Sequence, residues 1–299
     1  MGEPKPTTPH DKEIDMSRPP VALSIAGTDP SGGAGVHADL KTFTALRAYG
    51  TSVITALVAQ NTHGVSRVYG IDTDFVSDQF DSVLTDMPVD ATKTGMLGTR
   101  QLVEMVAERA GRGGLGFLVV DPVMVATSGH RLLEEDAVDA VRTLMVPAAH
   151  VITPNLPEAA LLLGDDVEPA HDLDTMRYQA RELIERGARG VLVKGGHGEG
   201  DEVLDVLALN DGTDVTLTEY RHQRITTPNT HGTGCTLSAA ITALAARQAL
   251  EGTLDVPEVV GTALDYLARA LESGKDWTLS LDPNGAHGPV DHMVTIPTP

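Results

Sequence analysis

The sequence predicts a three-layer α/β/α fold with a mostly parallel central sheet and a small flap at its edge. From Val21 onward, short β-branched runs alternate with helical patterns, which is typical of a parallel sheet covered by helices on both faces. A length of 299 residues suits one large α/β domain. Hydrophobic content of 41% with 3% aromatic residues indicates a core of Ala, Val, Leu and Ile.

The alternation predicts each element in turn. The expected strands are Val21–Ala26, Ser52–Gln60, Asp90–Thr94, Phe117–Asp121, Val151–Thr153 and Gly190–Lys194. The expected helices between them are Gly35–Tyr49, Asp74–Thr85, Arg100–Ala110, Glu134–Met145 and Asp174–Arg186. Two further strands, Glu202–Leu209 and Val215–Tyr220, flank the hairpin signal Asn210-Asp-Gly212. A long helix runs on from Cys235, a last helix spans Pro257–Ser273, and Val65–Ile71 is the expected flap strand.

Composition excludes several classes of protein. A net charge of −20 repels nucleic acid and anionic membrane surfaces. No stretch approaches the roughly 18 apolar residues of a membrane span. One cysteine excludes an internal disulfide and agrees with a reducing, cytoplasmic location. Residues 1–20 lack an apolar signal core and are expected to form a flexible tail before a single domain at 21–299.

A glycine-rich loop follows the first expected strand, from Gly27 to Gly35. Gly33, Gly35 and Ala38 satisfy the G-x-G-x-x-A spacing of dinucleotide-binding domains. That class is rejected because five residues separate Gly27 from Gly33, and because the second expected strand ends in Gln60-Asn without an acidic residue. Such a turn is structural as often as it binds a ligand.

Polar motifs end three more of the expected strands. They are Asp121-Pro-Val123, Thr153-Pro-Asn155-Leu-Pro-Glu158 and Lys194-Gly-Gly-His197. Carboxyl ends of parallel strands are where open α/β sheets bind ligands. Lys194 suits a phosphate, and Asn155 with Glu158 suits Mg²⁺, directly or through water. Ordinary roles are also open: a surface lysine, a capping box and a turn aspartate.

The lone thiol, Cys235, lies in His231-Gly-Thr-Gly-Cys235, which leads directly into an apolar-periodic helix. Unpaired N–H groups and about half a positive charge at a helix N-terminus bind phosphate and are expected to lower a thiol pKa. The alternative is a small buried hydrophobe beside an ordinary helix start. Together with the strand-end motifs, this loop indicates ATP-dependent phosphoryl transfer.

The ordered motifs resemble the bacterial hydroxymethylpyrimidine/phosphomethylpyrimidine kinases of thiamine biosynthesis, which have the ribokinase-like fold. The resemblance runs from about Ala22 to Gly288-Pro-Val-Asp-His292, and rests on Ala26–Gly35, Ala56–Thr62, Lys93–Leu97, Asp121–Met124, Thr153–Glu158, Lys194–His197 and His231–Cys235. It implies phosphorylation of 4-amino-5-hydroxymethyl-2-methylpyrimidine by MgATP, then phosphorylation of the monophosphate to the pyrophosphate. It also implies a homodimer.

The resemblance assigns roles to the matching residues. Those implied around the pyrimidine are Gly27, Asp39, Val58, Gln60, Met96 and Val123. Those implied in catalysis are Gly232, Thr233, Gly234, Cys235 and Lys194, and those on the nucleotide are Asn155, Lys194, Thr233 and Gly234. Asp121 and Glu158 are implied on the Mg²⁺ side. Because sugar kinases of this fold usually have Asp at the position of Cys235, we hypothesise that the thiol orients the substrate hydroxyl and accepts its proton.

Two other functions remain open. A pyridoxal kinase shares most of these motifs but stops at the monophosphate. A catalytically silent pyrimidine-binding or regulatory protein on the same scaffold is a rival from another class, although every expected polar position is filled.

Overall fold

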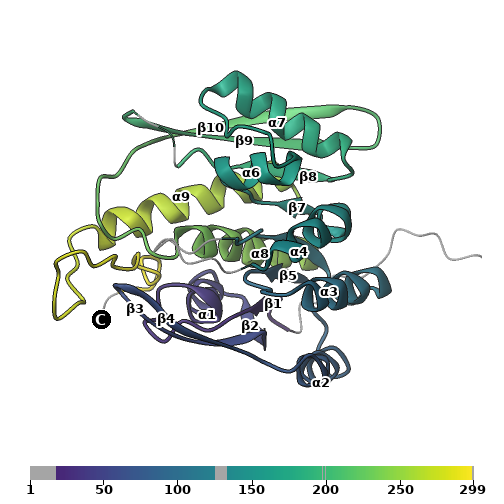
Figure 1. Cartoon of the computed structure of the whole chain (residues 1–299), viewed down its shortest axis with the longest axis horizontal. Helices are drawn as coiled ribbons and strands as arrows, with labels where there is room; N and C mark the ends of the chain where they lie inside the picture. Colours follow the sequence, from purple (N-terminus) through teal and green to yellow (C-terminus); the bar gives the residue numbers. More distant parts are fainter. Residues whose placement is uncertain (1–17, 125–132, 197, 199, 298–299) are drawn as a thin grey trace, which may run out of the picture.

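An eight-stranded sheet lies between two helical layers in the computed structural model, which describes residues 18–124, 133–196, 198 and 200–297 (Figure 1). The sheet order is β10-β9-β8-β7-β6-β5-β1-β2. Its parallel strands are β1 (Val21–Ala26), β2 (Tyr49–Ile54), β5 (Ala91–Thr94), β6 (Phe117–Val120), β7 (Val151–Ile152) and β8 (Gly190–Val193). β9 (Glu202–Asn210) and β10 (Val215–Gln223) extend it antiparallel and form the expected hairpin.

The helices divide between two apolar cores, one on each face of the sheet. The first core involves α2 (Thr73–Leu84), α3 (Arg100–Arg112), α4 (Glu135–Ala140), a π-helical turn (Val141–Met145), α5 (Val146–Ala148), α6 (Leu156–Leu163) and α7 (Leu173–Glu185). The second involves α1 (Gly35–Ala45), α8 (Thr233–Glu251) and α9 (Val256–Gly274). α8 is rich in alanine and contacts β1, β5 and β6, so small side chains let it pack close to the sheet. The expected three layers are confirmed.

The second expected strand, Ser52–Gln60, is wrong as one element. The chain leaves the sheet at Thr55, whose Oγ1 donates to the Met96 carbonyl at 2.7 Å and whose N–H donates to Ala26. The following strand β3 (Ala56–Asn61) pairs antiparallel with β4 (Gly64–Gly70) in a separate two-stranded sheet. This pair, called the flap below, confirms the expected edge flap.

Helix α1 ends at Ala45, earlier than the expected Tyr49. Arg47 has a positive φ of 63°, which ends the helix and turns the chain into β2. The expected N-terminal tail, residues 1–20, lies mostly outside the described residues. His197, the last residue of the Lys194-Gly-Gly-His197 motif, also lies outside them. Within the described part, Arg18 donates to both carboxylate oxygens of Asp90, at 2.6 and 2.8 Å, and anchors the end of the tail.

Among the described residues, no helix has the length and apolar character needed to cross a membrane.

Candidate active site

A cavity of about 820 Å³ runs along the carboxyl ends of the parallel strands. The flap lines one end, and residues from β9, β10 and the loop after them line the other. Each strand between these ends contributes a side chain or loop, because parallel strands end on the same edge of the sheet. The cavity therefore brings together motifs that are more than 200 residues apart in the sequence, such as Asp29 and His231 at a separation of 202 positions.

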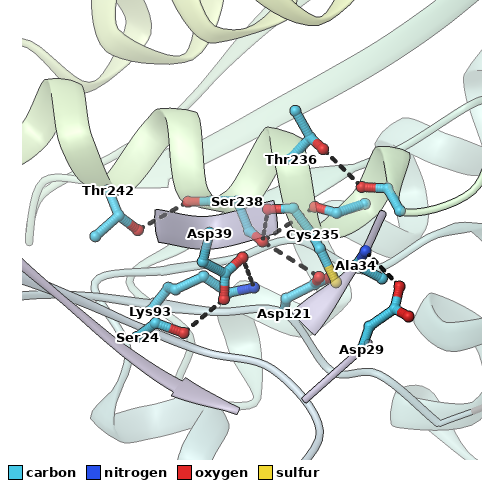
Figure 2. A network of polar contacts seen from close by, with 12 residues as sticks. Ser24, Asp29, Ala34, Asp39, Lys93, Asp121, Cys235, Thr236, Ser238 and Thr242 are labelled. Carbon is cyan, nitrogen blue, oxygen red and sulfur yellow. Dashed lines mark hydrogen bonds and ion pairs between the residues drawn. The ribbon is translucent and has the colours of Figure 1, made fainter. Parts of the chain in front are cut away.

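All but one of the expected site residues line this cavity. They are Gly27, Val58, Gln60, Met96, Asp121, Val123, Asn155, Glu158, Lys194, Gly232, Thr233, Gly234 and Cys235. The exception is Asp39, which is fully buried behind the cavity wall. Its carboxylate accepts from Lys93 Nζ at 2.9 Å and from Ser24 Oγ at 2.5 Å (Figure 2). Asp39 therefore does not line the cavity, and its contact with the pyrimidine stays a prediction.

Lys93 is a residue that the motif contained but sequence reasoning left without a role. It stands on β5 opposite Ser24 of β1 and is fully buried. Burial is the largest single influence and opposes the charge, but Asp39 and Asp121 together raise the pKa of Lys93. The signal was a lysine inside an otherwise buried strand, since buried charges are almost always paired. The pair places a fixed positive charge close enough to act on Cys235.

The floor of the cavity is the first turn of α8. Gly232 precedes it with a left-handed φ of 78°, and a Cβ there would lie 1.8 Å from the Gly33 carbonyl oxygen. Only glycine fits, so the two glycine loops pack directly against each other. The helix then presents the N–H groups of its first turn at the end of a 19-residue helix, which is a favourable place for a phosphate.

Lys194 and Asp121 stand next to this turn. Lys194 Nζ lies 3.1 Å from Asp121 Oδ1, and a Cβ on Gly234 would lie 3.4 Å from Nζ. Burial opposes both charges, but their mutual attraction raises the pKa of Lys194 and lowers that of Asp121. Lys194 is therefore a fixed cation beside the helix N-terminus.

Asn155 and Glu158 form the capping box that was the ordinary alternative. Asn155 Oδ1 accepts from the Glu158 N–H, and Glu158 Oε2 accepts from the Asn155 N–H, both at 2.8 Å. Both residues also line the cavity, so the structural role leaves the functional one open. Burial, with the nearby charge of Asp121, raises the pKa of Glu158 to about 7 against the opposing attraction of Lys194.

The expectation that the helix N-terminus lowers the pKa of Cys235 is wrong. Protein packed around the partly buried thiol removes water and raises its pKa to about 11, and the charges of Asp39 and Asp121 add to the rise. Lys93 and the N–H of Gly35 oppose the rise without cancelling it. Figure 2 shows the sulfur between Asp121 and the loop that contains Ala34. Cys235 is thus a neutral thiol at neutral pH.

Asp29 and His231 join the two glycine loops, and neither was assigned a role of its own from the sequence. Asp29 Oδ2 lies 2.7 Å from His231 Nε2 and accepts from the N–H groups of Gly33 and Ala34. Although burial opposes ionisation, the bonds from His231 and Ser31 lower the pKa of Asp29 to about 2. No motif rule connects positions this far apart.

The far end of the cavity is apolar on one side. Its wall there comes from α9 and the neighbouring strands, and includes Leu264, Leu267, Ala268, Leu271, Ile225 and Val203. In the sequence these residues fit the apolar face of a helix and an ordinary strand. Their pattern therefore gave no prediction that they face a ligand. Arg224 closes this end by donating to the carbonyls of Gly196, Gly198 and Gly200.

Comparisons with known proteins agree with this geometry. A family model described as phosphomethylpyrimidine kinase matches residues 29–291. The chain is 48% identical to the hydroxymethylpyrimidine/phosphomethylpyrimidine kinases of Salmonella typhimurium and of Escherichia coli. In each case the match covers 91% of this chain and 97% of the relative.

Solved structures are similar over nearly the same span. An ADP complex of Bacillus subtilis pyridoxal kinase has a TM-score of 0.79 at 35% identity, covering 93% of this chain and 98% of that one. The phosphomethylpyrimidine kinase of Clostridium difficile has a TM-score of 0.71 at 36% identity, covering 84% and 98%.

Proposed function

The chain belongs to the phosphomethylpyrimidine kinase family and is a hydroxymethylpyrimidine/phosphomethylpyrimidine kinase of thiamine biosynthesis with a ribokinase-like fold, and from this premise we propose how its cavity performs both phosphorylations. The observation that carries the proposal is the continuity of the cavity. A polar end under the flap, an anion-binding helix N-terminus and an apolar end beside α9 share one space. Acceptor, transferred phosphoryl group and nucleotide then meet in line.

The pyrimidine lies under the flap in this proposal. Gln60 both donates and accepts hydrogen bonds, so its amide suits the aminopyrimidine edge. Val58 and Met96 supply apolar contact on either side of Gly27, where a Cβ would lie 2.5 Å from Met96 Cε. The absence of that Cβ lets the Met96 side chain pack against the Gly27 backbone and so sets the wall against which the ring would lie. Val123 lines the same cavity at the end of β6.

Phosphoryl transfer takes place at the first turn of α8. The hydroxymethyl oxygen attacks the γ-phosphorus of ATP, and the bond to the β–γ bridging oxygen breaks. N–H groups from Gly232 to Cys235 bind the transferring group, and Lys194 neutralises the charge that develops on it. Asn155, Thr233 and Gly234 bind the nucleotide phosphates. The apolar wall of α9 is the place for the adenine ring.

Asp121 and Glu158 would hold Mg²⁺, partly through water. The donor set fits, because Mg²⁺ prefers oxygen ligands and usually keeps several waters and substrate phosphates. Within the described residues no cluster of three metal-ligating side chains occurs, which suits an ion that arrives with the nucleotide. Bound there, the ion would supply charge neutralisation for the phosphates.

Replacing Glu158 by glutamine removes a negatively charged oxygen ligand. The Mg²⁺ concentration that gives half-maximal activity is therefore expected to rise about tenfold, which corresponds to about 1.4 kcal/mol of lost binding free energy. The isosteric amide keeps the cap of α6. The measurement is a magnesium titration of the initial rate at fixed ATP. An unchanged midpoint would remove Glu158 from the metal site.

The test of the overall function incubates purified protein with MgATP and hydroxymethylpyrimidine, with pyridoxal in parallel, and follows the products by mass. Pyrimidine monophosphate and then diphosphate are expected. Pyridoxal is included because pyridoxal kinases are among the structurally similar proteins, with a TM-score of 0.79 for one of them. Phosphorylation of pyridoxal alone would contradict the two-step function, and no product from either would favour a silent binding protein.

The proposal includes a cytoplasmic homodimer. The outer face of the flap exposes Leu57 and Tyr69, which stand opposite each other in the β3–β4 register. Exposed apolar neighbours of this kind support the proposal that this face contacts a second copy of the chain. Light scattering on the purified protein should give twice the 31.5 kDa chain mass, and a monomer mass would contradict the dimer.

A further inference from the structure

One cavity must accept two acceptors of different charge, since the proposed function phosphorylates a neutral alcohol and then the anionic monophosphate. The chain itself is strongly acidic, with a net charge of −20. The cavity wall carries Asp29, Asp121, Glu158 and Asp205. A phosphate dianion entering this space therefore needs a nearby cation or donor.

The lysine and arginine of the described cavity wall lie away from the flap end. Lys194 is paired with Asp121 at 3.1 Å beside the α8 turn. Arg224 follows β10, at the opposite end of the sheet from β2 and the flap, and its guanidinium donates to three loop carbonyls. Each of them already faces protein partners, and Lys194 also serves the transferring phosphoryl group in the proposed mechanism.

His231 is the group that remains at that end. It lies between the flap and the glycine loop, with its Nε2 3.2 Å from Gln60 Nε2 and 2.7 Å from Asp29 Oδ2. A Cβ on Gly33 would lie 2.4 Å from His231 Cδ2, so the Cδ2–Nε2 edge of the ring packs against that loop. The Nδ1–Cε1 edge is on the opposite side of the ring from the Gly33 loop. Asp29, an ionised acceptor with its pKa near 2, holds the ring in this orientation.

Resting on the proposed function, we propose that His231, oriented by Asp29, binds the phosphate of the monophosphate acceptor and so determines that the second phosphorylation occurs. The imidazole donates to a phosphate oxygen through its Nδ1 edge. Asp29 keeps its contact with Nε2 whether the alcohol or the monophosphate is bound, so the ring holds one orientation in both steps. Gln60 releases His231 to contact the pyrimidine edge.

The test compares kcat/KM for hydroxymethylpyrimidine and for its monophosphate in His231→Gln, with the binding of the monophosphate measured by calorimetry without ATP. We expect kcat/KM for the monophosphate to fall at least tenfold more than kcat/KM for the alcohol, mainly through KM, with the calorimetric Kd rising in parallel. His63→Gln, on the exposed turn of the flap, is the matched control and should leave the ratio of the two steps unchanged.

An equal loss in both steps, or an unchanged Kd for the monophosphate, would overturn the role of His231. A variant that still phosphorylates the alcohol has kept its fold and its anion-binding turn, so that activity serves as an internal check. Failure of the wild-type protein to form any diphosphate would instead overturn the two-step function. The two proposals therefore fail in different experiments.

Discussion

Replacing Lys194 by methionine is expected to lower kcat by about 10²–10³-fold, the typical loss when one donor to a developing oxyanion is removed. The ammonium group stands beside Gly234 at the first turn of α8, where the transferring phosphoryl group is proposed to lie. The substitution also removes the cation that lies 3.1 Å from Asp121, so the unpaired carboxylate charge would repel the phosphates. The rate is measured at saturating MgATP and pyrimidine.

Lys194→Arg is the matched variant because it keeps the charge but changes the geometry. It should recover part of the lost rate, since neutralisation needs only a nearby cation, whereas the planar guanidinium cannot occupy the same point. Thermal unfolding of both variants separates lost catalysis from lost folding. A methionine variant with near-normal kcat would place the transferring group elsewhere in the cavity.

Replacing Cys235 by alanine is expected to lower kcat by about 10²–10⁴-fold, the range of a general base, with little change in KM for the pyrimidine. The sign of the pH dependence follows from the raised pKa of about 11. A thiol accepts a proton only after losing its own, and four pH units below this pKa roughly one thiol in 10⁴ is ionised. The rate should therefore rise about tenfold per pH unit from pH 7 to 9.

Two variants separate the base from its alternatives. The rise with pH should be absent in Cys235→Ala. In Cys235→Asp the carboxylate is ionised at lower pH, so activity above that of the alanine variant with a flat profile near pH 7 is expected. Near-normal turnover of Cys235→Ala would leave the thiol as packing only. A pH-independent wild-type rate would mean that the thiol orients the hydroxyl without taking its proton, as a loose transition state permits.

The flap shows where local patterns stop being sufficient. Residues 52–60 form one continuous β-favouring run, so periodicity alone predicts one strand. The break at Thr55 comes from hydrogen bonds to Ala26, at the end of β1, and to Met96, in the loop after β5. Because the partners are distant in sequence, no local rule could find them. The break nevertheless carries Val58 and Gln60 off the sheet and over the cavity.

From the sequence alone one could predict most strands and helices in their order along the chain, the polar motif at each strand end and the glycines of the tight loops. These follow from periodicity and from backbone sterics, which are local. Side-chain burial, pKa values and contacts between distant segments were fixed only by the folded structure. It placed Asp39 behind the wall with Lys93, raised the thiol pKa of Cys235, and brought Asp29 onto His231 across 202 positions. Desolvation and Coulomb energy depend on the distances between packed groups, and those distances exist only once the chain has folded.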